Sequence, residues 1–278
     1  RVNVAALISS EYPIEEAQAA YDDVLKGGPS KIGVLLKYPE HQLDSTTRTY
    51  HLKSQTSNLK SQISIALVGA GSFAKAMHVP NLKALGVRVP VVVSGSGVSA
   101  RQVAELLGAE KATTDFDSVL ADSAVNAVLI STRHNLHAAQ VIAAAKAGKH
   151  IFVEKPLGLT GNECRAAVEA VEAAGGLCTV GFNRRFSPFA VAARNALKSA
   201  AGPKQIVCRV NAGPLPKTHW LLDPNEGGGR LIGEGCHFFD LMVWLVGSAP
   251  ESMAAQRIGD SMDDASTVVR FAAGSVGT

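Results

Sequence analysis

The feature that most constrains this chain is an apolar run that stops at a glycine-rich turn, Ile63-Ser-Ile-Ala-Leu-Val-Gly69-Ala-Gly71-Ser-Phe-Ala74. The run is typical of a buried strand, and the residues after the turn favour a helix. Gly69 allows a tight turn, Gly71 lets backbone amides approach a pyrophosphate, and Ala74 lets the helix pack close to the strand. The first N–H groups of such a helix attract phosphate. The sequence therefore predicts a dinucleotide site made by Gly69, Gly71, Ser72, Phe73 and Ala74.

Composition and charge narrow the function classes. With 278 residues, of which 46% are hydrophobic and 18% charged, the chain has an ordinary composition for one or two globular domains. The net charge of +3 and the lack of a basic run predict no nucleic-acid partner. We expect no membrane partner and a cytoplasmic location, because no apolar run approaches about eighteen residues and nothing resembles a signal peptide.

The cysteines and the chain ends carry two further expectations. Cys164, Cys178, Cys208 and Cys236 lack CxxC spacing, which argues against zinc or disulfides and predicts reduced, buried thiols. The chain begins at Arg1 and stops at Thr278 just after a strand-like run, so we expect both ends to be cut from something longer.

From residue 63 onward, short apolar runs alternate with helical stretches. We expect strands at 89–94, 127–131, 151–154 and 179–182, and helices near 74–85, 99–107, 135–147 and 160–174. Such alternation indicates a parallel sheet covered on both faces, which binds its ligand at the carboxyl ends of the strands. The prediction is an α/β fold, a Rossmann doubly wound parallel sheet over residues 63–182.

The order of expected helices and strands changes after residue 182. Helices near 188–199 and 234–246 and strands at 205–210 and 267–271 predict an α+β domain over 183–278, with a mostly antiparallel open sheet that is incomplete. Residues 1–43 form a separate piece, in which Pro13 opens an amphipathic helix that stops at Gly27, followed by a strand at 32–36 that must pack on something else. The polar residues 44–62 are expected to be a linker.

Several side chains follow the expected strands. Ser94 stands where an acidic residue usually holds the adenosine ribose, and Arg101 either accommodates a 2′-phosphate or is a solvated helix residue, so NAD and NADP both stay open. The segment 131–137 contains two histidines three residues apart, His134 and His137. No third metal ligand has matching spacing, so no metal is assigned. We expect that segment to line the nicotinamide side of the cleft through Ser131, Thr132, Arg133, His134 and His137.

The segment Glu154-Lys155-Pro156 places a lysine at the end of a buried strand, in the cleft, and we expect Glu154 and Lys155 to contact the cofactor. Pro156 restricts Lys155 to an extended conformation, through a peptide bond that is either cis or trans. An ammonium group there can polarise a substrate oxygen. The alternative is an exposed lysine after a strand.

A further candidate for the catalytic site is the run Gly227-Gly-Gly-Arg230-Leu-Ile-Gly233-Glu234-Gly-Cys-His237. Glu234 and His237 are three residues apart on one helix face, and an imidazole beside a carboxylate has a pKa near neutrality that suits it to accept a hydroxyl proton. The alternative is that His237 is simply packed.

These motifs, with Gly181-Phe-Asn183-Arg184-Arg185-Phe186 and Asp240, resemble the Gfo/Idh/MocA oxidoreductases. The resemblance spans roughly 63–278 and implies a Rossmann domain, a C-terminal α/β domain with an open sheet, homo-oligomers through that sheet, and sugars or cyclitols as substrates. It implies Lys155 and His237 as the catalytic pair. The family often has an Asp four residues before the histidine; here that residue is Gly233, with Glu234 as the substitute.

A shorter resemblance covers the first 40 residues. Tyr12-Pro-Ile-Glu-Glu-Ala-Gln-Ala-Ala-Tyr21 and Ile32-Gly-Val-Leu-Leu-Lys-Tyr-Pro39 are similar to the end of a zinc-type, medium-chain alcohol dehydrogenase. The chain would then be a piece of a bi-domain oxidoreductase.

The leading hypothesis is NAD(P)-dependent hydride transfer to or from a secondary hydroxyl of a sugar, cyclitol or sugar derivative. We expect the substrate to be held by Asn183, Arg184, Arg185, Trp220, Arg230 and His237, with the two adjacent arginines suited to an anionic group. Trp220 either stacks on a sugar face or lies in the core. Two alternatives stay open: a redox-neutral, NAD-dependent glycoside-cleaving enzyme and a non-catalytic NAD(P)-sensing protein.

Overall fold

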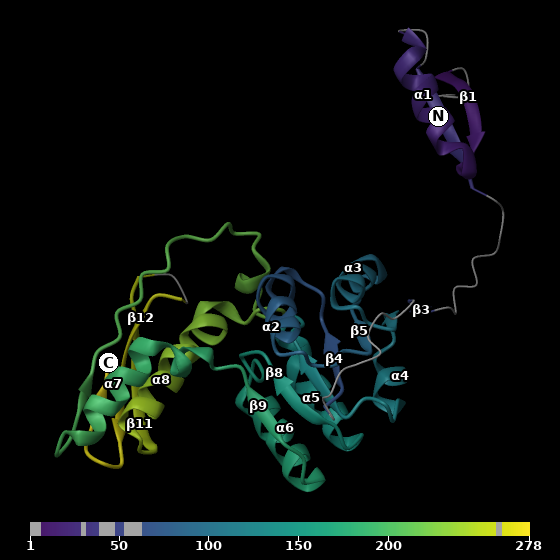
Figure 1. Ribbon diagram of the computed structural model, residues 1–278. Helices are drawn as coiled ribbons and strands as arrows, with labels where there is room; N and C mark the ends of the chain where they lie inside the picture. Colours follow the sequence, from purple (N-terminus) through teal and green to yellow (C-terminus); the bar gives the residue numbers. More distant parts are fainter. Residues whose placement is uncertain (1–6, 29–31, 39–47, 53–62, 260–262) are drawn as a thin grey trace. The chain divides into compact units, whose positions relative to one another are not determined.

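The computed structural model describes residues 7–28, 32–38, 48–52, 63–259 and 263–278, and the chain divides into two compact units, Arg1–Thr47 and Arg48–Thr278 (Figure 1). The first unit is a parallel pair of strands connected by a helix: β1 (Ile8–Pro13), a 3₁₀ turn (Ile14–Glu16), α1 (Ala17–Lys26) and β2 (Gly33–Lys37). The sequence did not predict β1, and Pro13 ends this strand instead of lying inside the helix. The helix stops at Gly27, as expected.

A seven-stranded sheet forms the centre of the second unit, with the strand order β3-β6-β5-β4-β7-β8-β9. Its strands are β3 (Thr49–His51), β4 (Ile65–Val68), β5 (Val91–Val93), β6 (Lys111–Thr113), β7 (Ala127–Ile130), β8 (His150–Val153) and β9 (Cys178–Val180). All pairs from β6 to β9 are parallel. In chain order these six strands lie 3-2-1-4-5-6, the order of a Rossmann fold. The predicted doubly wound fold is confirmed.

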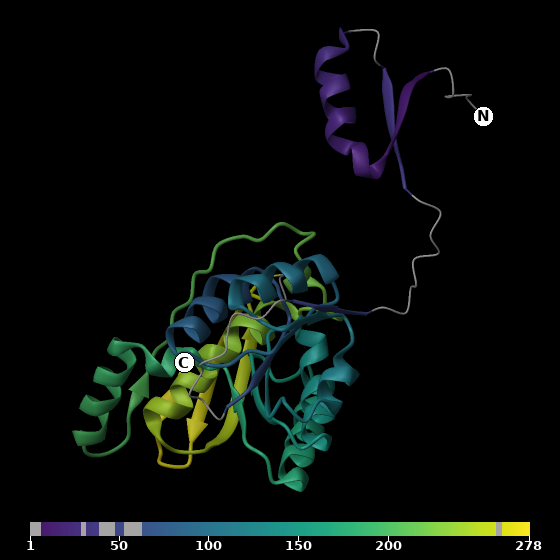
Figure 2. The same cartoon turned by 45° about the vertical axis from the view of Figure 1, so that its right-hand side comes forward.

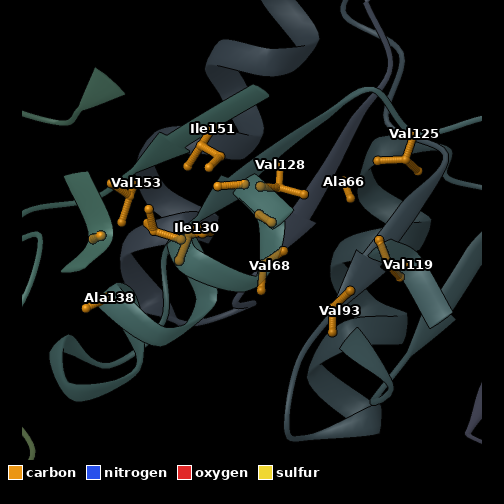
Figure 3. Close-up of a cluster of buried hydrophobic side chains, with 14 of the residues drawn as sticks. Ala66, Val68, Val93, Val119, Val125, Val128, Ile130, Ala138, Ile151 and Val153 are labelled. Atoms are coloured by element: carbon orange, nitrogen blue, oxygen red, sulfur yellow. The ribbon is translucent and has the colours of Figure 1, made fainter. Parts of the chain in front are cut away.

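Helices cover both faces of this sheet. They are the π turn η4 (Ala74–His78) continued by α2 (Val79–Ala84), then α3 (Gly97–Leu107), α4 (Phe116–Ala121), α5 (His134–Lys146) and α6 (Gly161–Ala174). Successive residues of β4 point to opposite faces: Ala66 and Val68 pack with α4, α5 and α6, whereas Leu67 packs with α2 and α3. Figure 3 shows the first of these clusters. Burial on both faces explains why the strands are apolar throughout.

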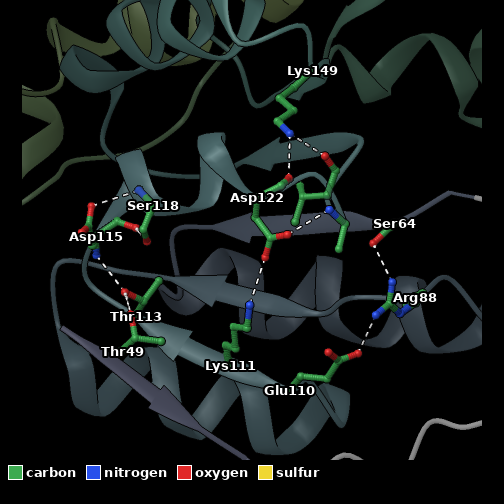
Figure 4. A network of polar contacts seen from close by, with 12 residues as sticks. Thr49, Ser64, Arg88, Glu110, Lys111, Thr113, Asp115, Ser118, Asp122 and Lys149 are labelled. Carbon is green, nitrogen blue, oxygen red and sulfur yellow. Dashed lines mark hydrogen bonds and ion pairs between the residues drawn. The ribbon is translucent and has the colours of Figure 1, made fainter. Parts of the chain in front are cut away.

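The segment expected to be a linker over 44–62 contains a strand. β3 pairs antiparallel with β6 at the edge of the sheet, and Thr49 Oγ1 lies 3.0 Å from Thr113 Oγ1 (Figure 4). Lys111, in β6, forms an ion pair of 3.0 Å with Asp122. β3, at the edge of the sheet, and β6, next to it, were missed because short strands with polar residues lack the continuous apolar pattern of the central strands.

The C-terminal part is a four-stranded sheet of order β10-β13-β12-β11, covered by helices on one face (Figure 2). Its elements are α7 (Pro188–Ser199), β10 (Gln205–Ile206), a 3₁₀ turn (Trp220–Leu222), the π turn η7 (Leu231–Gly235), α8 (Cys236–Val246), β11 (Pro250–Arg257), β12 (Ala265–Phe271) and β13 (Val276–Gly277). β11–β12 and β12–β13 are antiparallel and β10–β13 is parallel, which confirms the predicted mostly antiparallel sheet. Met242 of α8 packs on Val269 and Phe271 of β12. β10 is shorter than the strand expected at 205–210, and β11 was not predicted.

Two further expectations concern the cysteines and the membrane. All four cysteines are free. They are half-buried, whereas the sequence predicted buried thiols. In the described part of the chain, no helix has both the length and the apolar character needed to cross a bilayer.

The turn after β4 gives a stability prediction. Gly69 has φ of 101°, and a Cβ there would lie 2.3 Å from the carbonyl oxygen of Ser131. Gly69→Ala should therefore lower the free energy of unfolding by about 2 kcal/mol or more, through backbone strain and overlap. Gly71→Ala is the matched control, because a Cβ at residue 71 meets nothing within 4 Å. Urea denaturation of both variants measures the difference, and equal stabilities would contradict the close approach.

Candidate functional site

The glycine-rich turn lies at the carboxyl end of β4, beside β7, where the strand order reverses. Gly69 N–H donates to Val93 O at 2.7 Å, which ties the turn to β5. A helix begins directly after Gly71, and Ala74 within it is fully buried, as the predicted close packing of helix on strand requires. The open space at Gly71 leaves the first N–H groups of this helix accessible to a phosphate.

A cavity of about 850 Å³, here called the strand-end cavity, lies over this turn. Its predicted lining residues are Gly69, Gly71, Ser72, Phe73, Ser94, Ser131, Thr132, Arg133, His134 and Lys155. Gly95, Ser96, His219, Leu221 and Gly233 also line it, and were not assigned from the sequence. Arg101 is not among the lining residues: it pairs with Glu105 at 2.9 Å and lies over the ring of Tyr50.

His137 and Glu154, expected at the cofactor, do not line the strand-end cavity. His137 is fully buried, with Nδ1 2.7 Å from Pro156 O and Nε2 3.2 Å from Thr132 O. These contacts connect α5 to the segment that carries Lys155. Burial lowers the pKa of His137, so the ring is a neutral structural element.

The sequence predicted Trp220 at the substrate. The structure places it in the wall of the strand-end cavity, and it does not line the second cavity, which contains His237. The guanidinium of Arg133 lies 4.1 Å from the centre of its indole ring, and His134 contacts it edge to face at 4.7 Å. Arg133 also pairs with Glu226 at 3.1 Å. The indole therefore closes this part of the cavity wall together with two residues from the end of β7.

Lys155 follows β8, and its peptide bond to Pro156 is cis. The ammonium Nζ donates to Gly233 O at 2.8 Å. A side chain at residue 233 would lie 2.5 Å from Leu221 Cδ1 and 2.9 Å from His134 Cε1, so this packing has no room for an aspartate there. Gly233 therefore contacts Lys155 through its backbone carbonyl alone.

A second cavity of about 670 Å³, here called the His237 cavity, lies on the other side of Lys155. It is lined by Phe73, Glu154, Lys155, Asn183, Arg184, Phe186, Ser187, Val210, Ala212, Glu234, His237 and Phe238. Phe73, Lys155 and Glu234 line both cavities. The two cavities therefore share a stretch of wall, here called the junction, which includes Lys155.

His237, in the first turn of α8, is buried, and its Nδ1 has no hydrogen-bond partner among the described residues. Its pKa is lowered to about 4, first by burial and then by the positive charges of Lys155 and Arg184. This differs from the near-neutral pKa expected from a carboxylate neighbour. The imidazole is therefore neutral at pH 7 and can accept a proton.

Glu234 lines both cavities, but its carboxylate faces Arg230, with Oε2 3.1 Å from Nε. Its expected partnership with His237 is not found. Arg230 lines neither cavity, and its guanidinium also contacts Gly213 O, so it is not at the expected substrate position.

The two adjacent arginines have different surroundings. Arg185 binds the carboxylate of Asp240 through two nitrogens and does not line the His237 cavity, contrary to expectation. Arg184 does line it, with its guanidinium 4.6 Å from the ring centre of Phe238.

His78 lines neither cavity, but it lies beside Glu154 of the His237 cavity, a contact that sequence reasoning missed. Its Nε2 lies 3.0 Å from Glu154 Oε1, at ion-pair distance but without hydrogen-bond alignment, and both side chains are almost buried. The π turn η4 carries His78 to this position, and such turns are frequent at functional sites. Across the described residues, no group of histidine, cysteine or acidic side chains has the arrangement of a metal site.

Comparison with known proteins places these features in a family. Residues 63–182 match the family described as "Oxidoreductase family, NAD-binding Rossmann fold", and residues 202–278 match the "GFO/IDH/MocA C-terminal domain". Over 233 residues the chain is 31% identical to scyllo-inositol 2-dehydrogenase (NAD(+)) of Bacillus subtilis, covering 79% of this chain and 67% of that protein. It is 29% identical over 259 residues to levoglucosan dehydrogenase of Pseudarthrobacter phenanthrenivorans, covering 78% and 66%.

The comparison with solved structures points to the same family. A levoglucosan dehydrogenase in complex with NADH and levoglucosan is 29% identical, with a TM-score of 0.65 over 77% of this chain and 65% of that one. The chain spans about two thirds of the length of these relatives. It belongs to the Gfo/Idh/MocA family of oxidoreductases, with an NAD-binding Rossmann fold at residues 63–182.

Proposed function

We propose that this protein transfers a hydride between a nicotinamide cofactor and a secondary hydroxyl or ketone of a sugar, cyclitol or sugar derivative. The observation that carries the proposal is the junction of the two cavities at Phe73, Lys155 and Glu234. Hydride transfer needs the cofactor ring and the substrate carbon in contact at one point. The strand-end cavity has the volume for a dinucleotide and the His237 cavity has the volume for a sugar.

The described residues fit a dinucleotide. The space left at Gly71 and the helix start after it suit a pyrophosphate, and Ser94, Gly95 and Ser96 line the cavity at the end of β5. Thr132, Arg133 and His134 would border the nicotinamide half. When bound, the cofactor supplies the hydride acceptor or donor.

The roles that we assign to the protein's own side chains follow from charge. Lys155 keeps a positive charge next to the substrate oxygen and stabilises negative charge that develops there. His237, neutral because of its lowered pKa, accepts the hydroxyl proton during oxidation and returns it during reduction. Glu234, which borders both cavities while paired with Arg230, would orient the substrate or the ring, in place of acting as the base.

Three expectations about the whole protein are part of the proposal. We propose a cytoplasmic protein and an origin of residues 1–43 in the end of a zinc-type alcohol dehydrogenase domain, followed by domains at 63–182 and 183–278, with β3 from the segment 44–62 added to the first of these. We also propose that copies associate through the open face of the C-terminal sheet. Support for the last point comes from exposed apolar side chains in that sheet, Met253 and Val268.

Removing the ammonium group tests the proposed chemistry. Lys155→Ala should lower kcat by about 10²- to 10⁴-fold, the size of a positioned polar catalyst, while the Kd for NADH changes little. Stopped-flow turnover and NADH fluorescence titration measure the two quantities. Lys146→Ala, an exposed lysine in the last turn of α5, is the control that should change neither. Unchanged turnover in Lys155→Ala would contradict the assignment.

The pH dependence tests His237 as the base. The neutral, proton-accepting form predominates above its pKa of about 4, well below the 6.5 of an ordinary histidine. For oxidation, the kcat/KM should therefore show no histidine inflection between about pH 7.5 and 5.5. A tenfold fall per pH unit below about 6.5 that disappears in His237→Asn would contradict the buried, neutral imidazole.

A further inference from the structure

We propose that the substrate carries an anionic substituent, a carboxylate or a phosphate, and that Arg184 binds it in the His237 cavity. The inference rests on the proposed function and narrows its substrate class. It follows from which charges around this cavity already have partners and which do not.

Both carboxylates of the cavity wall face a positive or protonatable partner. Glu154 lies 3.0 Å from His78, and Glu234 lies 3.1 Å from Arg230. Neither His78 nor Arg230 lines the His237 cavity. Arg230 therefore offsets the charge of Glu234, whereas the charge of Glu154 still acts on His237 in the cavity.

The two cations that line the cavity lack such compensation. Lys155 donates to the neutral carbonyl of Gly233, and Arg184 contacts the ring face of Phe238. Within the described ranges, neither has a carboxylate within ion-pair distance, whereas the next residue, Arg185, is held by Asp240. Stacking on an aromatic ring leaves the N–H edges of a guanidinium free, and those edges match a carboxylate or phosphate in a two-bond geometry.

The charges of Lys155 and Arg184 also affect the pKa of His237. Lys155 and Arg184 both disfavour the protonated form of His237, and together they outweigh the opposing influence of Glu154 and Asp240. The cavity is thus electropositive where it meets the base. An anion bound at Arg184 would relieve this charge, and the polar side chains of Asn183 and Ser187 line the same cavity and can accommodate sugar hydroxyls.

The experiment measures binding and turnover separately on the full chain saturated with NADH or NAD. D-glucuronate and D-glucose 6-phosphate probe the carboxylate and the phosphate, and D-glucose and myo-inositol are the neutral counterparts. We expect at least one anionic probe to raise the melting temperature of the NADH complex more than its neutral counterpart. Arg184→Gln should weaken that binding by about 10- to 100-fold, the loss of a charge-assisted pair, and leave the Kd for NADH unchanged.

Arg194→Gln is the matched control, because Arg194 also stacks on an aromatic ring, that of Trp244 at 4.3 Å, but lines neither cavity. It should leave probe binding at the wild-type value. Arg184→Lys should recover only part of the affinity, because an ammonium lacks the planar fork.

The outcomes separate this inference from the proposed function. Oxidation of neutral sugars, with anionic probes that neither bind nor react, would overturn the inference while the proposed function stands. Binding of an anionic probe that depends on Arg184, without NADH formation from any probe, would support the inference and count against the hydride transfer. The larger response of the two anionic probes identifies carboxylate or phosphate as the preferred group.

Discussion

The close approach of two backbone segments at the centre of the sheet is the contact on which the rest of this structure depends. Gly69 leaves β4 directly against Ser131 at the end of β7, at a separation that no side chain could occupy. The strand order reverses between these two strands, so their connections run to opposite sides and leave a crevice. Gly71 and the polar residues after β7 line the same cavity beside this contact.

The second constraint is electrostatic. The loop after β8 brings Lys155 to the carbonyl of Gly233, and this hydrogen bond joins the Rossmann sheet to the helix that carries His237. Burial beside two cations keeps the imidazole neutral, so a proton acceptor and a permanent positive charge lie in one cavity. A lysine and a histidine with these different charges can polarise an oxygen and take its proton at the same time.

Local patterns predicted the parts of the fold that local residues determine. The apolar strands, the turn at Gly69 and the helix starts follow from burial and backbone geometry, so the Rossmann sheet could be expected from the sequence. The short strands β3 and β6 were missed because pairing with a neighbour, and not their composition, makes them strands. The partners of the site residues were harder to predict. Arg185 binds an acid 55 residues away, and Glu234 pairs with Arg230 in preference to His237. Spacing indicates which side chains share a face, but competition among partners needs the tertiary structure.

The most direct test of the central claim is a crystal structure of the protein with NAD bound. We predict the pyrophosphate at the backbone N–H groups that follow Gly71, and the nicotinamide ring at the junction bordered by Phe73, Lys155 and Glu234, open to the His237 cavity. Density for the cofactor elsewhere, or a nicotinamide ring turned away from Lys155 and His237, would contradict the account.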